Sequence, residues 1–173
     1  MTDAPHLPRP SSLWKGLSPD RKILAADAFW KDDSAAAEQA EVIAAIAYRL
    51  KFRPKSVIAL TREKKSRYLI GLGLVTEMAA ARLLVAYHLE HQRPMMGHFL
   101  DALGVAHEGG LIADEDMAAP SEDRLKAGAK AIAAVYPAPD VALYLSTLVW
   151  QDPDTWGGLA PLPESQGAGE SGS

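Results

Sequence analysis

The sequence predicts an all-α fold, arranged as a single-domain bundle of about seven short helices. Between residues 18 and 160, apolar residues recur at intervals of three and four, which is the spacing of one face of an α-helix. No stretch alternates polar and apolar residues with the period of two that a half-buried strand requires. A length of 173 residues fits one domain of ordinary size.

The first half of the predicted bundle contains four helices, each opened by a cap residue or a proline. Ser18 followed by Pro19 is the clearest opening, because a serine side chain caps free amide groups and proline suits a first turn. In the second helix, acidic residues near the start and basic residues near the end suit the helix dipole. The predicted ranges are 19–30 after Ser18, 35–51 after Ser34, 54–60 from Pro54 and 62–72 after Thr61.

The most apolar helix is predicted after Thr76 and extends through His91. Because it is apolar nearly all round, we expect it at the centre of the bundle. Its one strong charge in the middle, Arg82, needs a carboxylate partner if it is buried. The candidate partners are Glu77, Asp101 and Asp140.

Three further helices follow, again delimited by prolines, glycines and a serine. Two consecutive glycines are typical of a helix end, since glycine tolerates the left-handed conformation found there. The predicted helices start at Pro94 and stop at Gly109–Gly110, run from Ser121 to Tyr136, and run from Pro139 to Trp150, with a final turn at Asp152–Pro153.

One sequence pattern occurs twice in the chain. The segments 46–60 (IAYRLKFRPKSVIAL) and 85–100 (VAYHLEHQRPMMGHFL) share Ala-Tyr-x-Leu, an Arg-Pro step and a closing Leu. In both, a helix ends and proline starts the next one, which indicates a helical hairpin. Either the hairpin is duplicated or a common turn is reused, and the sequence alone leaves both interpretations open.

The two ends of the chain differ in composition from the helical domain at 18–160. Residues 1–17 are predicted to form a mobile Pro-rich arm, and residues 161–173 a disordered Gly/Ser-rich tail, because neither holds enough apolar residues to offset the entropy of ordering. The chain has no cysteine, no secretory signal at its start and no apolar run long enough for a membrane helix. We therefore expect a soluble, cytoplasmic protein with no membrane partner.

A block of positive charge is the feature that points to a partner. Eight of the 18 Lys and Arg residues lie between residues 49 and 67, where Glu63 is the only acid, so the block carries +7 in a chain of net charge −4. Such segregation creates a local field that attracts anionic partners. We take these residues as the candidate binding surface: Arg49, Lys51, Arg53, Lys55, Arg62, Lys64, Lys65 and Arg67.

Two kinds of partner suit this block. The first is an acidic protein surface, on another protein or on a second copy of the chain. The second is nucleic acid, because residues 46–67 roughly match a helix-turn-helix unit whose recognition helix would begin at Pro54 and carry Lys55, Ser56 and Thr61. That predicted helix is short and mostly apolar, and the chain is acidic overall, whereas DNA-binding domains are usually basic. We therefore expect a protein partner or self-association, with nucleic acid as the alternative.

A third hypothesis is a metal-dependent enzyme that uses His88, His91 and His98 with nearby carboxylates, since imidazole and carboxylate suit zinc, iron or manganese. The spacing matches no metal motif: HExxH and paired Glu-x-x-His are both absent. A G-x-S-x-G nucleophile and a Gly-rich phosphate loop are absent as well. The sequence identifies no catalytic residue and favours a non-enzymatic binding or assembly module without a cofactor.

Overall fold

The structure is a computed structural model that describes residues 8–114 and 116–159. In this part of the chain, ten α-helices and one two-stranded hairpin are present, which confirms the all-α class. The helices outnumber the predicted seven because short segments such as α1 (Pro10–Gly16) and α10 (Pro153–Trp156) are helical too. The predicted tail at 161–173 and the first seven residues of the predicted arm lie outside the described residues.

The span predicted as one helical domain contains two compact units, which divide between Gln92 and Arg93. We call residues 9–92 the N-terminal unit and residues 93–159 the C-terminal unit. Each unit buries its own large apolar side chains, among them Phe29 and Ile46 in the first and Phe99 and Ile132 in the second.

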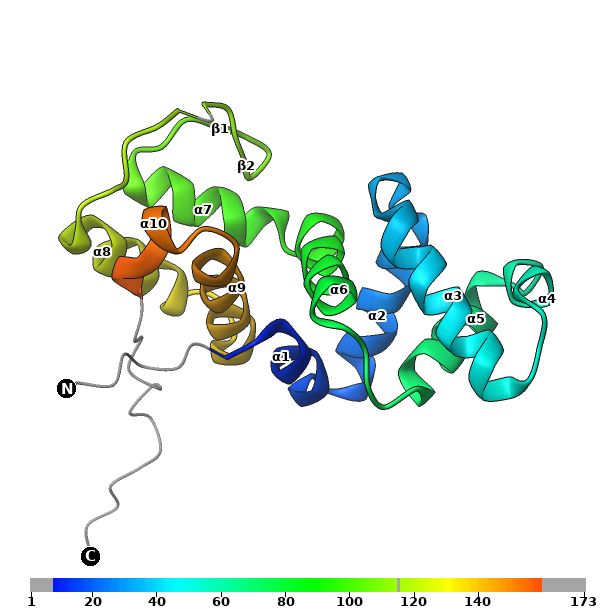
Figure 1. The fold of residues 1–173 in the computed structure, drawn as a ribbon. Helices are drawn as coiled ribbons and strands as arrows, with labels where there is room; N and C mark the ends of the chain where they lie inside the picture. Colours follow the sequence, from blue (N-terminus) through cyan, green and yellow to red (C-terminus); the bar gives the residue numbers. More distant parts are fainter. Residues whose placement is uncertain (1–7, 115, 160–173) are drawn as a thin grey trace, which may run out of the picture. The chain divides into compact units, whose positions relative to one another are not determined.

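Three helices of the N-terminal unit begin where the sequence predicts them, because their caps are local (Figure 1). The side chains of Ser18, Thr61 and Thr76 each accept a hydrogen bond from the backbone amide three residues further on. The elements after α1 are α2 (Pro19–Lys31), a 3₁₀ turn (Asp33–Ala35), α3 (Ala36–Leu50), α4 (Pro54–Ile58), α5 (Arg62–Gly71) and α6 (Glu77–His91).

The start of α3 differs from the prediction that Ser34 caps it. The carboxylate of Asp32 accepts a hydrogen bond from the Ser34 amide and caps the 3₁₀ turn, and α3 then begins without a side-chain cap. Aspartate and serine compete for this role, and aspartate stands first in the chain.

Helix α6 takes the central position predicted for it within its unit, where it packs against α1, α2 and α3. Its buried residues occupy most of its circumference. The candidate partners for Arg82 were wrong: its guanidinium Nε lies 3.4 Å from a carboxylate oxygen of Glu38 on α3. The Glu38 side chain is nearly buried, so this pair joins the two helices at the edge of the core.

The arm predicted at residues 1–17 differs from the structure in its second half. Residues 10–16 form α1, whose Trp14 is only 4% exposed. The amide and hydroxyl of Ser11 both donate to the carboxylate of Glu77 at the start of α6. The buried Trp14 anchors α1 to the rest of the unit, and the proline content of the segment gave no indication of this.

The C-terminal unit contains α7 (Arg93–Leu103), strands β1 (His107–Glu108) and β2 (Leu111–Ile112), α8 (Glu122–Ala133), α9 (Ala138–Gln151), α10 and a final 3₁₀ turn (Gly157–Leu159). Ser121 caps α8 as predicted. Helices α7 and α8 pack closely because α8 has Gly128 at the contact: a Cβ there would lie 3.0 Å from Leu103 and 3.1 Å from Phe99. The Phe99 ring also meets Tyr144 of α9 edge to face.

The prediction that α7 continues to Gly109–Gly110 was wrong. The helix ends at Leu103, followed by Gly104 in the left-handed conformation with φ of +71°. Gly109 and Gly110 instead form the tight turn of an antiparallel hairpin, with φ of +57° and +88°. Glycine is suited both to a helix end and to a tight hairpin turn. In this chain, Gly104 ends α7, and Gly109 and Gly110 form the hairpin turn.

The two similar segments do not share a turn geometry. After α3, residues 51–53 form the turn, and Lys51 adopts the left-handed conformation with φ of +57°. After α6, Gln92 with φ of −124° is the single residue before α7 begins. The resemblance is therefore one of sequence pattern, without a common turn.

Candidate functional site

The eight residues of the basic block lie on the end of α3, the following turn, α4 and α5, all in the N-terminal unit. Seven of them are exposed, and Lys65 is half-buried. They do not form one continuous charged face, because some bind other parts of the unit while others project into solvent.

Four of the eight are engaged within the unit. Arg62 donates to the Asp27 carboxylate at 2.6 Å, and the Lys65 ammonium lies 4.9 Å from the centre of the Trp30 ring, so both side chains fasten α5 to α2. Arg67 pairs with Glu63 on its own helix, and Arg49 donates to the backbone carbonyl of Gly71. These contacts explain half of the block as internal structure.

The Asp27 carboxylate is the centre of a small ion-pair network. Burial raises its pKa, but hydrogen bonds from Lys31 and Arg62 outweigh burial and lower the pKa overall. The Lys31 ammonium also lies 3.1 Å from Glu90 on α6, and these carboxylates raise its pKa. The network therefore links α2, α5 and α6.

The other four basic residues have no carboxylate within ion-pair distance in the described part of the chain: Lys51, Arg53, Lys55 and Lys64. Three of them, Lys51, Arg53 and Lys55, lie in the turn after α3 and at the start of α4. Long cationic side chains without an internal partner remain available to an external one.

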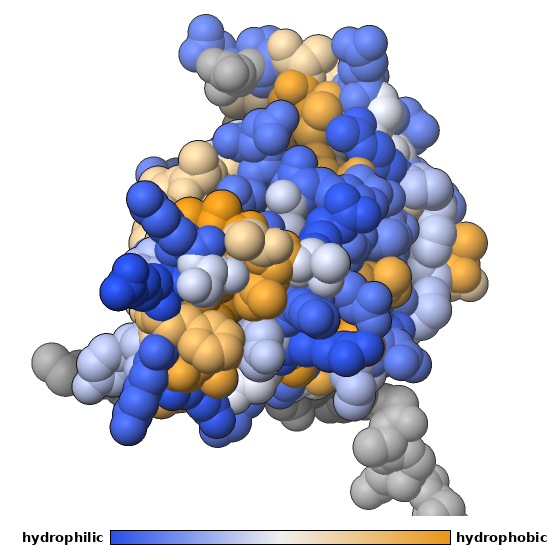
Figure 2. All heavy atoms as spheres, turned by 90° about the vertical axis from the view of Figure 1, so that its right-hand side faces the viewer, coloured by the Kyte–Doolittle hydropathy of each residue, from blue (hydrophilic) through white to orange (hydrophobic). Residues whose placement is uncertain are grey.

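Large exposed apolar side chains occur in the same stretch of the chain as these three cations. Tyr48 is 90% exposed, Ile58 is 58% exposed and Phe52 is 44% exposed. Tyr48, Lys51, Phe52 and Pro54 line one open hollow at the end of α3. Figure 2 views the side of the molecule that carries α4 and α5 and shows apolar side chains gathered among hydrophilic ones.

We call this surface the α3–α4 corner and define it by six residues: Tyr48, Lys51, Phe52, Arg53, Lys55 and Ile58. Single exposed apolar residues are ordinary on protein surfaces. An almost fully exposed tyrosine that shares a hollow with a phenylalanine and an unpaired lysine is a combination found at binding surfaces. Two further unpaired cations and an exposed isoleucine follow on the adjoining turn and α4. The corner is suited to a ligand that carries both negative charge and apolar groups.

The geometry of a helix-turn-helix unit is only partly present. Lys51 adopts the left-handed conformation at the turn position usually occupied by glycine. The helix that would be the recognition helix, α4, has five residues, and its Val57 is buried. The hydroxyl of Thr61, one of the predicted contact residues, instead accepts the Lys64 amide to cap α5. Lys55 and Ser56 are exposed on α4.

The three candidate metal-binding histidines lie in different surroundings. His88 is buried beside the Tyr87 ring, and His91 is exposed against the same ring. His98 belongs to the C-terminal unit and meets Tyr136 edge to face, with ring centres 5.8 Å apart. Among residues 8–114 and 116–159, no three His, Asp or Glu side chains are grouped so that they could hold a metal ion.

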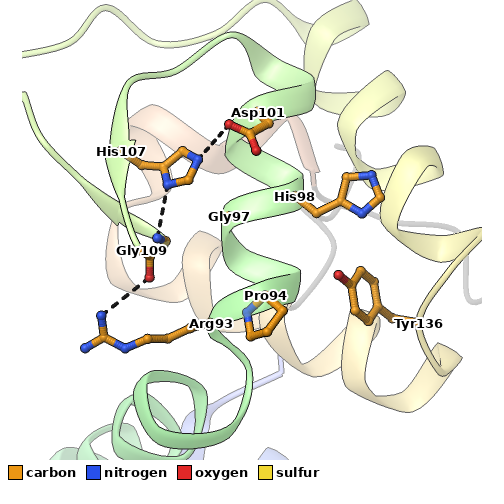
Figure 3. Close-up of a pocket in the computed structure, with 9 residues that line it drawn as sticks. Arg93, Pro94, Gly97, His98, Asp101, His107, Gly109 and Tyr136 are labelled. Atoms are coloured by element: carbon orange, nitrogen blue, oxygen red, sulfur yellow. Dashed lines mark hydrogen bonds and ion pairs between the residues drawn. The ribbon is translucent and has the colours of Figure 1, made fainter.

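Sequence reasoning missed a hydrogen-bonded His–Asp pair, which lies in an open hollow of the C-terminal unit (Figure 3). His107 Nε2 lies 2.7 Å from a carboxylate oxygen of Asp101, and His107 Nδ1 accepts the Gly110 amide at 3.1 Å. Because Nδ1 accepts a hydrogen bond, the neutral ring carries its proton on Nε2 and donates it to Asp101. Both ring nitrogens of His107 are engaged in hydrogen bonds, so we interpret the His107–Asp101 pair as a structural link between the hairpin and α7 and not as a general base. His107 begins strand β1, whereas the helix predicted to continue to Gly109–Gly110 would have contained it.

None of the helices among the described residues is long and apolar enough to cross a membrane. The residue roles above rest on the geometry of this chain alone. No protein-family model matches the chain, and searches of curated proteins and of solved structures found no significant match.

Proposed function

We propose that the protein is a non-enzymatic binding module whose α3–α4 corner docks an acidic, partly apolar segment of a protein partner. The observation that carries the proposal is the open hollow at the end of α3, where Tyr48, 90% exposed, lies with Phe52 and the unpaired Lys51. We propose the cytoplasm as its location, since a chain without cysteine suits a reducing compartment.

Charge and apolar surface have separate roles in such a contact. Lys51, Arg53 and Lys55 would raise the rate of encounter with an acidic segment and orient it. Tyr48 and Ile58 would supply the apolar area that makes the contact last, because aromatic anchors lose little conformational entropy on binding. Helices α3 and α4 pack against each other and hold both sets in place.

A protein partner is favoured over nucleic acid by the chemistry of α4. Its exposed side includes Ile58, which offers nothing to a phosphate, and five residues are too few to follow a major groove. Arg62 and Lys65, which would extend a phosphate-binding surface, are engaged with α2. The chain also carries a net charge of −4.

The test is a binding titration of the full chain against four probes: a random copolymer of glutamate and tyrosine, polyglutamate, duplex DNA and duplex RNA. We expect the Glu/Tyr copolymer to bind about tenfold more tightly than polyglutamate, because it engages both parts of the corner. Binding should weaken between about 50 and 200 mM NaCl but should not vanish, because the apolar part is insensitive to salt. Tighter binding to DNA or RNA than to the copolymer would assign the corner to nucleic acid.

Two variants locate the binding surface. Tyr48→Ala removes a side chain that packs on almost nothing, so a loss of copolymer binding of about tenfold cannot be ascribed to unfolding. Arg53→Ala with Lys55→Ala should reduce binding and its salt dependence. The matched controls are Leu74→Ala, which removes a side chain 82% exposed elsewhere, and Lys15→Ala with Lys130→Ala. Equal losses in the controls, or no binding of the copolymer, would refute the proposal.

A further inference from the structure

We infer that the acidic partner is a second copy of this chain, whose C-terminal unit offers an acidic, apolar hollow to the α3–α4 corner. The inference rests on the proposed function and names the partner that the corner would bind.

The two units carry opposite charge. Residues 9–92 contain fourteen Lys and Arg against nine Asp and Glu, whereas residues 93–159 contain four against ten. The positive excess of the first segment comes from the basic block. Opposite charges on two parts of one chain attract the unlike parts of neighbouring copies.

The hollow lies between the end of α7 and the start of α8. Its walls are mostly apolar and include Leu103, Val105, Met117 and Pro120. Asp114 and Arg124 are its charged lining residues. A methionine in such a wall adapts to the shape of an inserted side chain.

Several acidic residues are sequence neighbours of the residues that line this hollow. Asp116 precedes Met117, and Glu122 and Asp123 follow Ser121. Glu122 pairs with Lys126 at 3.0 Å. Asp114, Asp116 and Asp123 have no cation within ion-pair distance in the described part of the chain. We call the four apolar wall residues together with these three carboxylates the acidic hollow.

The corner and the hollow complement each other in three respects. Three unpaired cations face three unpaired carboxylates. The corner has protruding apolar groups, with Tyr48 90% and Ile58 58% exposed, and the hollow has an apolar floor that could accept one of them. The hollow also keeps a net negative charge, since its lining cation, Arg124, is outnumbered by the three carboxylates.

The contact uses different surfaces on the two copies, so it is heterologous. Each copy retains one unused corner or one unused hollow after a first contact, and further copies add to it until a ring closes. The expected species are therefore short oligomers in a concentration-dependent equilibrium.

The first experiment is sedimentation velocity of the full chain between roughly 1 and 300 µM, the range in which weak interfaces become visible. We expect the mean sedimentation coefficient to rise with concentration. The association constant should fall about tenfold between about 50 and 200 mM NaCl, because the charges are exposed before contact. The Glu/Tyr copolymer should dissociate the oligomers, because it competes for the corner.

Two neutralised variants test the two surfaces separately. Arg53→Gln with Lys55→Gln removes charge from the corner only, and Asp116→Asn with Asp123→Asn removes it from the hollow only. Each variant alone should remain monomeric. An equimolar mixture should form a one-to-one complex and stop there, because it contains one intact corner and one intact hollow. The matched controls are Lys15→Gln with Lys130→Gln and Asp20→Asn with Asp33→Asn, all exposed residues away from both surfaces.

A wild-type chain that stays monomeric at every concentration would overturn the inference, as would oligomers that both variants retain. In either case, copolymer binding that Tyr48→Ala abolishes would leave the proposed function standing with a different acidic partner. Absence of both self-association and copolymer binding would refute the two together.

Discussion

At the scale of single residues, the conformation of Lys51 has the clearest energetic meaning. It is the one residue other than glycine with a positive φ in the described part of the chain. A side chain in this conformation costs roughly 1–2 kcal/mol relative to glycine. The chain therefore keeps a cation at a position where glycine would end α3 more favourably, which agrees with a use for the charge.

Lys51→Gly tests this strain. Glycine removes the clash but makes the unfolded chain more flexible, so we expect the free energy of unfolding to rise by only about 0.5–1 kcal/mol. Lys51→Ala removes the same charge and keeps the strained conformation, so it should not raise stability. Urea unfolding of both variants measures the difference, and equal stabilities would contradict the account.

Gly110 is the residue whose replacement should harm the C-terminal unit most. A Cβ there would lie 2.8 Å from the Cβ of Met96 and 3.1 Å from the Arg93 carbonyl oxygen, at a φ of +88°. We expect Gly110→Ala to lower the free energy of unfolding by at least about 2 kcal/mol. In Gly109→Ala, the nearest atom is the flexible Arg93 guanidinium at 3.4 Å, so a loss of about 1 kcal/mol is expected. Equal losses in urea unfolding would show that packing against α7 is unimportant.

At the scale of elements, the starts of four helices were predictable because their caps are local. Ser18, Thr61, Thr76 and Ser121 all cap the helices predicted after them. The hairpin was not predictable, because Gly109–Gly110 fits a helix end as well as a tight turn. A helix end and a hairpin turn are distinguished here only by the pairing of strands β1 and β2 and by the hydrogen bond between His107 and Asp101.

Helix α1 should depend on the ionisation of Glu77. The hydrogen bond from the Ser11 hydroxyl outweighs burial and lowers the pKa of this carboxyl. A lowered pKa means that the interaction is fully present above the ordinary carboxyl range near pH 4.5 and is lost as the pH falls through the pKa of the folded state.

Hydrogen exchange of the α1 amides measures this dependence. At neutral pH, Glu77→Gln should speed exchange in α1, and the difference between the variant and the wild type should shrink as the pH falls below 4.5. Glu63→Gln, which breaks an exposed pair on α5, should leave α1 unchanged. Unaltered exchange in Glu77→Gln at neutral pH would show that Trp14 alone holds the helix.

At the scale of the whole molecule, composition identified the basic block but could not tell which of its charges are available. Arg62 and Lys65 contact Asp27 and Trp30, residues about 35 positions earlier that no local pattern links to them. The exposure of Tyr48 could not be predicted from the sequence either. The apolar stripe along α3 indicates which face of the helix is buried, but not which residues cover the end of the helix. The candidate site therefore emerged only when tertiary contacts separated engaged cations from free ones.

The division between Gln92 and Arg93 also bears on how the chain acquires its structure. The N-terminal unit is made from one continuous stretch of the chain, residues 9–92, and its contacts join positions as distant in sequence as Ser11 and Glu77. Domains generally form in order as they leave the ribosome. The α3–α4 corner of a growing chain therefore leaves the ribosome before the residues of the acidic hollow do, so finished copies can reach it first.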